Sequence, residues 1–386
     1  MDLERARYLL SEAGQAALSA SAALDTRDPV KLATALRRDL PASHAAAVAE
    51  QLTLRARALR NHGRDDPWLY TAEGLEMMTH PLVAERRARR LRGLELPIFD
   101  LTCGLGSDLA ALRAAGATAL GMDIDAVHAM FAAHNTRAGV VRGNAALPPA
   151  EIRRLAAVID PSRREGGSRR FSPDAFSPPW DTVLTLAGEA RAAVIKAPPG
   201  IGPEHVPAAA EFEAVQLGTS MREVALWLGA GATPGLRRAV LLPAGAVLDS
   251  TEAEADALPV PPAEVLFDPE SCVTRATLVR HLAHRLGASL LDPHIAYLTA
   301  SRPAFSPLAA TLEVLDVLPF SVARLKQRLR EGHWRPDEIR RRAFPVEPDE
   351  LRRLLGKLEG EPVTLLLTTL QSQRTVFIAR RLFPPA

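Results

Sequence analysis

Short apolar runs alternate with stretches of helical pattern from Leu96 onward, and this alternation limits the fold more than any other feature of the sequence. Such runs, separated by helices, are typical of a parallel sheet that helices cover on both faces. We therefore expect an α/β fold in which the chemistry gathers at the carboxyl ends of the strands. The runs span residues 97–100, 119–123, 157–160, 193–196 and 239–242.

The segments on either side have different patterns. Residues 1–92 are rich in Ala, Leu and Arg with apolar spacings of three and four, which predicts a helical N-terminal domain. We expect the α/β domain over 93–246, and a linker and mixed segment over 247–309. A small α/β domain is expected over 310–386. In this tail we predict strands over 311–318, 362–369 and 375–381, and helices over 320–330 and 348–358.

Composition excludes several classes of protein. The 386 residues are 47% hydrophobic and 24% charged, as in ordinary globular chains of two or three domains. No apolar run reaches the ~18 residues of a membrane helix, and the first residues lack the order of a signal peptide. The two cysteines, Cys103 and Cys272, exclude a disulfide scaffold and indicate a cytoplasmic protein. None of the ten histidines has metal-ligand spacing, so we expect no metal site.

The net charge of +2 is unevenly distributed. Residues 320–386 carry 14 Lys and Arg against 8 Asp and Glu, whereas residues 97–319 have a net charge of −6. A basic tail favours a polyanionic partner such as nucleic acid. The other reading is a solvated face in a chain that uses arginine throughout, since only four residues are lysine.

A glycine-containing turn is the most informative motif. Residues 100–108 read Asp-Leu-Thr-Cys-Gly-Leu-Gly-Ser-Asp, after an apolar strand and before an expected helix. Glycines are needed where a chain turns sharply or where a ligand touches the backbone. About twenty residues later a second strand ends in Asp123, where an acid can accept both hydroxyls of a ribose. The pattern predicts a nucleoside-containing cofactor.

The charges in the turn narrow the choice of cofactor. A dinucleotide site would carry a third glycine where Leu109 stands, and Asp108 would repel two phosphates. S-adenosylmethionine has no phosphate and carries sulfonium and ammonium cations, which Asp100 and Asp108 suit. We therefore expect S-adenosylmethionine rather than NAD or FAD.

These residues resemble the first motif of class I S-adenosylmethionine-dependent methyltransferases, Asp-Leu-x-Cys-Gly-x-Gly, and residues 121–125 resemble their ribose-binding strand end. The resemblance implies a Rossmann-like sheet. It also implies contact with the adenine after the third strand, which falls on Asn144 and Ala145, although the family usually has Asp there. The implied cofactor-binding residues are Asp100, Thr102, Cys103, Gly104, Gly106, Asp108, Asp123, Ile124, Asn144 and Ala145.

Residues 71–76, 292–299 and 344–346 are similar to a bacterial methyltransferase family with a THUMP-like C-terminal domain. This resemblance spans nearly the whole chain and implies a ferredoxin-like or THUMP-like fold for the tail. Because such domains resemble RNA-binding modules of tRNA-modifying enzymes, it also implies RNA as a partner. Residues 68–76 resemble, more faintly, the cap-guanine N2-methyltransferases.

The fourth expected strand ends at Asp160-Pro161, where related enzymes that methylate exocyclic amines carry Asp/Asn/Ser-Pro-Pro-aromatic. Asp160 would orient the amine and take its proton, and Pro161 would fix the adjacent carbonyl. Ser162 and Arg163 replace the second proline and the aromatic ring. Arg163 and Arg164 instead suggest a clamp for phosphate or carboxylate. The alternative is an Asp-Pro turn with two solvated arginines.

Two further side chains are candidates for substrate binding. Lys196, at the end of the fifth strand, either contacts a substrate phosphate or pairs with an acid such as Asp160. Trp68 either stacks on a base or packs in the core. Methylation of pyrimidine C5 needs a cysteine nucleophile, but Cys103 lies in the cofactor turn and Cys272 outside the predicted sheet, so we expect N- or O-methylation.

The leading hypothesis is a methyltransferase that N-methylates a nucleobase in tRNA or rRNA. A protein or small-molecule acceptor is one alternative, and a non-catalytic module that binds S-adenosylmethionine or RNA is another. The salt dependence of RNA affinity distinguishes an RNA acceptor from a protein or small-molecule acceptor, because a protein that contacts phosphates loses affinity steeply as salt rises.

Overall fold

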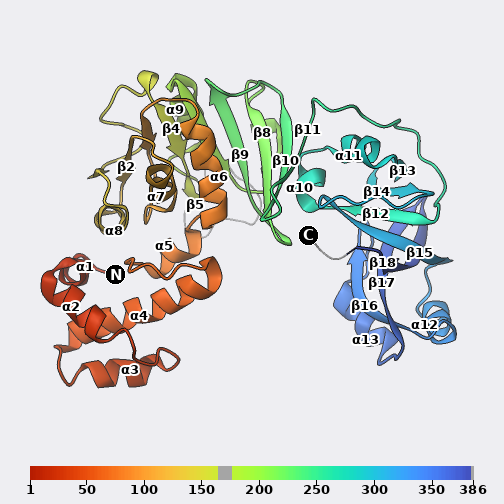
Figure 1. Cartoon of the computed structure of the whole chain (residues 1–386), viewed down its shortest axis with the longest axis horizontal. Helices are drawn as coiled ribbons and strands as arrows, with labels where there is room; N and C mark the ends of the chain where they lie inside the picture. The colour runs from red at the N-terminus through yellow and green to blue at the C-terminus, as the bar shows by residue number, and fades with distance from the viewer. Residues whose placement is uncertain (164–175, 384–386) are drawn as a thin grey trace. The chain divides into compact units, whose positions relative to one another are not determined.

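The computed structural model describes residues 1–163 and 176–383, which form two compact units (Figure 1). The first unit comprises Met1–Glu211 and Val224–Pro234, and the second comprises Phe212–Glu223 and Gly235–Ala386. Among the described residues, no helix has the length and apolar character needed to cross a membrane.

Six helices precede the first strand, and side-chain caps fix several of their ends. Asp2, Ser11 and Asp28 each accept a hydrogen bond from a backbone N–H in the first turn of the helix that follows. Gly63, with φ of +64°, ends the longest of these helices in the left-handed conformation that glycine favours. The helices are α1 (Leu3–Leu10), α2 (Glu12–Ala20), α3 (Pro29–Leu36), α4 (Ala42–His62), α5 (Ala72–Met77) and α6 (Pro81–Arg92).

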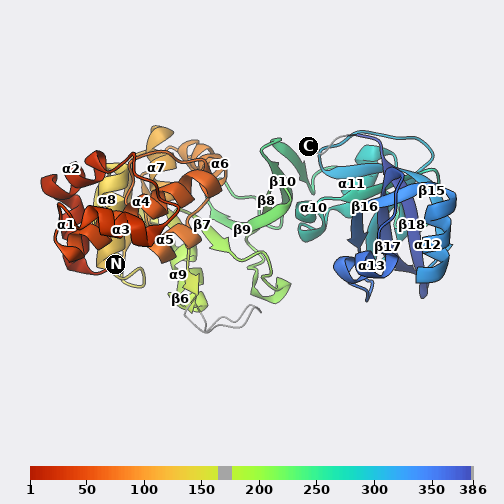
Figure 2. The same cartoon turned by 90° about the horizontal axis from the view of Figure 1, so that it is seen from below.

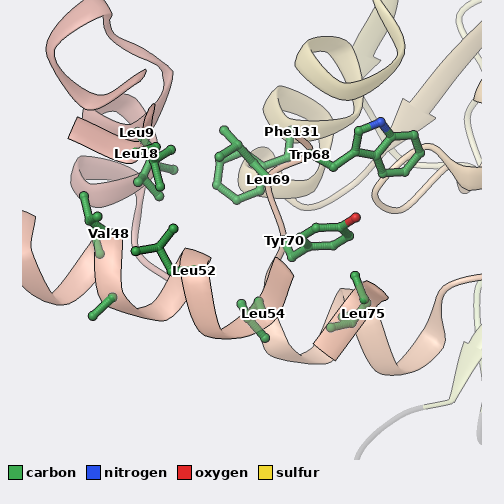
Figure 3. Close-up of a cluster of buried hydrophobic side chains, with 14 of the residues drawn as sticks. Leu9, Leu18, Val48, Leu52, Leu54, Trp68, Leu69, Tyr70, Leu75 and Phe131 are labelled. Atoms are coloured by element: carbon green, nitrogen blue, oxygen red, sulfur yellow. The ribbon is translucent and has the colours of Figure 1, made fainter. Parts of the chain in front are cut away.

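These helices share a core with the sheet of the first unit. Leu9, Leu54 and Leu69 are buried in a cluster that also contains Phe131 (Figure 3). Phe131 lies on α8 (Ala126–Thr136), the helix that connects two consecutive strands of the sheet. The amide of Gln51 donates to the backbone carbonyl of Tyr70 at 2.6 Å and accepts from its N–H at 2.8 Å, fixing the chain before α5. Residues 1–92 therefore pack into the same unit as the sheet. The predicted four-domain division stays a prediction.

The sheet of the first unit has the strand order β9-β7-β4-β1-β2-β3. All neighbours are parallel except β9, which runs antiparallel to β7. The predicted strands at 97–100, 119–123, 157–160 and 193–196 are confirmed. The strands are β1 (Ile98–Asp100), β2 (Ala119–Asp123), β3 (Val140–Arg142), β4 (Ala156–Ile159), β7 (Ala192–Ala197) and β9 (Ser220–Gly229).

The strand order reverses between β1 and β4, since the chain moves outward through β2 and β3 and returns to add β4 beside β1. In open α/β sheets, ligands bind outside the carboxyl ends of the strands at such a point. The remaining elements of this unit are α7 (Ser107–Ala114), α9 (Trp180–Glu189) and the short pair β5 (Ser162–Arg163) and β6 (Phe176–Ser177).

The second unit contains a seven-stranded sheet in the order β13-β14-β12-β15-β18-β17-β16. Its neighbours are antiparallel except β16 and β17. The strands are β12 (Val265–Pro269), β13 (Ser289–Asp292), β14 (Ile295–Ala300), β15 (Ala309–Pro319), β16 (Trp334–Arg341), β17 (Glu361–Leu370) and β18 (Gln373–Arg381). The helices are α10 (Ser271–Arg275), α11 (Val279–Leu286), α12 (Val322–Glu331) and α13 (Pro348–Leu355).

Helices α12 and α13 lie beside β16, β17 and β18 (Figure 2). Leu325 and Leu329 of α12 and Leu351 of α13 are buried against Leu365 and Leu367 of β17. Leu366, which alternates with them, is buried in a different cluster on the other face of the sheet. Both helices therefore cover one face of this sheet, and the strands and helices predicted for the tail are confirmed.

Strands also form where the sequence has no clear period. The predicted strand at 239–242 is confirmed as β10 (Arg237–Leu242). It pairs with two strands that we did not predict, β8 (Glu211–Leu217) and β11 (Ala246–Asp249). β11 falls largely within the start of the segment 247–309, where we expected a linker. Sequence reasoning missed it because a four-residue strand is too short to establish an alternation.

Candidate active site

A cavity of about 540 Å³ lies at the carboxyl ends of β1, β2, β4 and β7. Its size is typical of sites for small ligands. The glycine turn, Asp123, Asn144, Asp160 and Lys196 all line it, so the structure brings together residues up to about ninety positions apart.

The glycine turn is a tight reversal between β1 and α7. The Gly106 N–H donates to the Cys103 carbonyl at 2.8 Å, and Gly104 and Gly106 have φ of +52° and +92°, which disfavour side chains. A Cβ at Gly106 would lie 2.5 Å from Cγ2 of Thr136, whereas a Cβ at Gly104 would meet no atom within 4 Å. Gly106 is thus required for packing, and Gly104 leaves open space at the cavity wall.

Asp123 is held at the end of β2 by backbone donors. Its Oδ2 accepts from the Gly104 N–H at 2.9 Å, and its Oδ1 accepts from the Asp125 N–H at 2.9 Å. Burial is the largest influence and raises the pKa of Asp123. Each oxygen keeps a second lone pair, so the carboxylate can still accept hydrogen bonds from a ligand.

Asp100 and Asp108, the acids at the two ends of the glycine turn, differ in charge state. Burial, followed by the nearby Asp108 carboxylate, raises the pKa of Asp100 to about 8. Burial also favours the neutral form of Asp108, but the Arg87 guanidinium and the Lys196 ammonium outweigh it and lower the pKa of Asp108 to about 2. Asp108 also accepts from the Thr79 hydroxyl at 2.9 Å. At neutral pH, Asp108 is ionised and Asp100 largely protonated.

Lys196 joins this cluster to Asp160. Its ammonium donates to Oγ1 of Thr79 at 2.5 Å, to Oδ2 of Asp108 at 3.2 Å and to Oδ2 of Asp160. An ammonium has three donors, and these three oxygens match them. The pairing with Asp160 is the second of our two interpretations of Lys196. A direct contact with a substrate phosphate does not fit this arrangement.

Asp160 has one anchored oxygen and one open one. Its backbone N–H donates to Oγ1 of Thr102 at 2.6 Å, and its Oδ2 accepts from Lys196. Within residues 1–163 and 176–383, its Oδ1 has no hydrogen-bond partner, and 37% of the side chain is exposed. The carboxylate is therefore oriented but available at the cavity, where Pro161 is also part of the wall.

The other predicted cofactor residues lie around the same cavity. Ile124, Asn144 and Ala145 line it, and the Asn144 Oδ1 accepts from the Ala146 N–H at 3.0 Å. Cys103 is buried in the turn, and burial raises the pKa of its thiol far above the usual range. Since the thiolate is the nucleophilic form, Cys103 does not suit covalent catalysis.

Of the remaining predicted substrate residues, only Trp68 has a described side chain. Trp68 is 5% exposed and lies in the hydrophobic core, with Arg64 3.7 Å above its ring. A stacked base needs an open ring face, so this position does not suit the role that we predicted for Trp68. Arg163 ends β5, where it pairs with Phe176 across the strands. Arg164 lies outside the described residues.

The N-terminal segment supplies cavity residues that sequence reasoning missed. Glu73 and Met77 of α5 line the cavity, as does Thr79 in the loop after it. Arg87 of α6 forms a buried ion pair with Asp108. Pro81 at the start of α6 indicates a helix there. Arg87 is one of four arginines within five positions, and the apolar Val83 and Leu91, four residues to either side, mark it as the one on the buried side of α6.

A relative in Mycobacterium tuberculosis (strain H37Rv), an uncharacterised S-adenosylmethionine-dependent methyltransferase, is 36% identical over 299 residues. The alignment covers 72% of this chain and 80% of the relative. The chain belongs to the S-adenosylmethionine-dependent methyltransferases. The relative of the same description in strain CDC 1551 has the same identity and coverage.

Comparisons of parts and of the fold agree with this assignment. Residues 309–381 match the THUMP domain-like family, and residues 2–58 match a domain of unknown function (DUF8688). The crystal structure of a proposed methyltransferase from Porphyromonas gingivalis W83 has a TM-score of 0.77 at 21% identity. It covers 97% of this chain and 99% of that one. The predicted methyltransferase fold, THUMP-like tail, enzyme class and S-adenosylmethionine cofactor are thus confirmed.

Proposed function

We propose that this methyltransferase N-methylates a nucleobase in tRNA or rRNA. The observation that carries the proposal is Asp160, held on one oxygen by Lys196 and open on the other, in the same cavity as Gly104 and Asp123. A carboxylate that accepts a hydrogen bond from an exocyclic amine directs the nitrogen lone pair away from itself and into the cavity.

The cavity residues fit the cofactor in shape and charge. Asp123 would accept the ribose hydroxyls, and Asn144 and Ala145 would lie at the adenine. The open space at Gly104 lets a ligand lie against the backbone, which a larger residue would prevent. Asp100, Thr102 and Asp108 would lie toward the methionine end, where acids suit a cation. When bound, S-adenosylmethionine supplies an electrophilic methyl group.

The chain's own residues then hold the acceptor and take its proton. The Asp160 Oδ1 accepts from the amine, the Pro161 carbonyl fixes its second hydrogen, and Lys196 keeps the carboxylate in place. As the nitrogen gains a methyl group it loses one proton, which passes to Asp160 and from there to water. Arg163 and Arg164, which follow in the sequence, are proposed to contact phosphate.

The nature of the acceptor rests on two further observations. The THUMP domain-like match over 309–381 covers the basic part of the chain, where residues 320–386 have 14 basic against 8 acidic side chains. Both cysteines are buried and unpaired in the described structure, which agrees with the reducing cytoplasm where tRNA and rRNA are modified.

Asp160→Asn tests the proposal, with Asp181→Asn on the exposed start of α9 as the matched control. Each variant is incubated with RNA and trideuteromethyl-labelled cofactor, and labelled nucleosides are measured by mass spectrometry. We expect label on an exocyclic nitrogen with wild type and the control, and about 10²-fold less with Asp160→Asn. Label on a ring carbon, or undiminished label in Asp160→Asn, would contradict the proposal.

A further inference from the structure

Helix α12 carries cations without acidic partners. Four of its ten residues are Arg or Lys, of which Arg328 pairs with Asp316 at 2.5 Å. The one acid of the helix, Glu331, accepts from Gln327. Among the described residues, Arg324, Lys326 and Arg330 form no ion pair, and Arg353 of α13 forms none either. We refer to these four side chains together as the helix surface.

Several other exposed arginines of this domain are paired with acids, whereas Arg352 donates to backbone carbonyls and Arg374 forms no ion pair within the described residues. Arg335 binds Asp337 at 2.8 Å, and Arg380 binds Glu361 at 3.0 Å. Arg341 binds Glu347 as well. Three exposed arginines on or next to the strands are therefore neutralised, whereas the four cations of the helix surface have no acid partner among the described residues.

The cations of the helix surface point away from the core. Leu325 and Leu329 turn one side of α12 inward, and Lys326 and Arg330, four residues apart, share a neighbouring side. The ammonium of Lys326 lies beside the end of α13, since a Cβ at Gly356 would be 3.6 Å from its nitrogen. Arg353 is in the last turn of α13. Lys326, Arg330 and Arg353 thus lie on the outer side of the two helices, away from the sheet that they cover. Arg324 is also exposed, on the other flank of α12, because residues two apart on a helix point to different sides.

We infer that the helix surface binds the phosphate backbone of the substrate RNA. This inference rests on the proposed function. Phosphates repeat along a strand without regard to sequence, and Arg and Lys on neighbouring helical turns match such a row of charges. Cations held free of acids retain their full attraction for phosphate, whereas paired ones must first break an ion pair. RNA would be held here by its backbone, independently of the base to be methylated.

The test compares two triple variants with the same change in net charge. The helix variant is Arg324→Gln, Lys326→Gln and Arg330→Gln. The control variant, Arg27→Gln, Arg335→Gln and Arg380→Gln, removes three exposed arginines that are each paired with an acid. Affinity for unmodified tRNA is measured by fluorescence anisotropy between 50 and 200 mM salt, about the range over which phosphate contacts are lost.

For the helix variant we expect affinity about 10–100-fold lower at the lowest salt, with the slope of log affinity against log salt reduced by about 2. The control variant should bind within about twofold of wild type, with an unchanged slope. Arg353→Gln alone should reduce the slope by about 0.7–0.9. Calorimetry with S-adenosylmethionine should give the wild-type affinity for every variant, because the substituted side chains are outside the cavity.

A helix variant with wild-type affinity and slope overturns the inference and leaves the proposed function standing. Equal losses in the helix and control variants also overturn it, since net charge would then suffice. If wild type itself neither methylates RNA nor binds it in a salt-dependent way, the proposed function fails and the inference fails with it.

Discussion

The Asp100 carboxyl is buried at the end of β1, and its pKa of about 8 far exceeds its ordinary value of 3.8. A group whose pKa is raised by folding contributes stability that is present below the unfolded pKa and lost as pH rises through the folded pKa. We expect wild type to lose about 2–3 kcal/mol relative to Asp100→Asn between pH 6 and pH 9. Urea unfolding at both values measures this, and equal pH dependence in the two proteins would contradict it.

The same group should link cofactor binding to pH. A nearby cation favours ionised Asp100, so affinity for S-adenosylmethionine should rise as pH increases toward about 8. The product, S-adenosylhomocysteine, has a neutral thioether in place of the sulfonium and should respond less. Calorimetry at pH 6.5 and 8.5 compares the two ligands, with Asp100→Asn as the control that should abolish their difference.

Lys196 acts through Asp160 and does not touch the acceptor in our account. Lys196→Met should lower kcat about 10–100-fold by releasing Asp160, with KM for S-adenosylmethionine changed less than about threefold, because Asp108 keeps Arg87 and Thr79. Lys196→Cys treated with bromoethylamine regains an ammonium and should regain activity. Wild type treated in the same way controls for the buried Cys103 and Cys272. Unaltered kcat in Lys196→Met would exclude this role.

At the scale of elements, the two glycines of the turn between β1 and α7 have different roles: Gly106 allows close packing, and Gly104 leaves room for a ligand. Gly106→Ala places a methyl group 2.5 Å from Thr136 in a left-handed backbone and should lower the free energy of unfolding by about 2–4 kcal/mol. Gly104→Ala meets open space and should cost about 1 kcal/mol, yet its methyl group should weaken cofactor binding. Denaturant unfolding and calorimetry on both variants separate the effects. The reverse order of stability would contradict the account.

The elements that sequence predicts best are those with local signals. The buried strands are continuous apolar runs in the sequence. The turn is predicted by its two glycines, Gly104 and Gly106. The cluster of Thr79, Arg87, Asp108 and Lys196 has no such signal, because each contact joins segments at least twenty residues apart. Trp68 shows the same limit, since an aromatic residue beside a predicted site is packed in the core instead.

At the scale of the whole molecule, we propose that methyl transfer takes place in one part of the chain and that another part supplies most of the RNA affinity. The cavity lies entirely in residues 73–196, within the first unit, and the THUMP domain-like match lies at 309–381, within the second. We expect removal of residues 309–381 to leave cofactor affinity within about threefold while RNA affinity falls at least tenfold. Calorimetry and anisotropy on the shortened chain measure both, with circular dichroism to show that it folds. Loss of cofactor affinity in a folded chain would contradict the assignment.

The central claim is that one cavity holds the cofactor against Gly104 and Asp123 with its methyl group directed toward Asp160. A crystal structure with S-adenosylmethionine bound tests it through the distance from the methyl carbon to the nearer Asp160 carboxylate oxygen. An amine placed between them for reaction requires about 6 Å or less, with the ribose hydroxyls on Asp123. A ribose away from Asp123, or a methyl carbon more than about 10 Å from Asp160, would contradict the account.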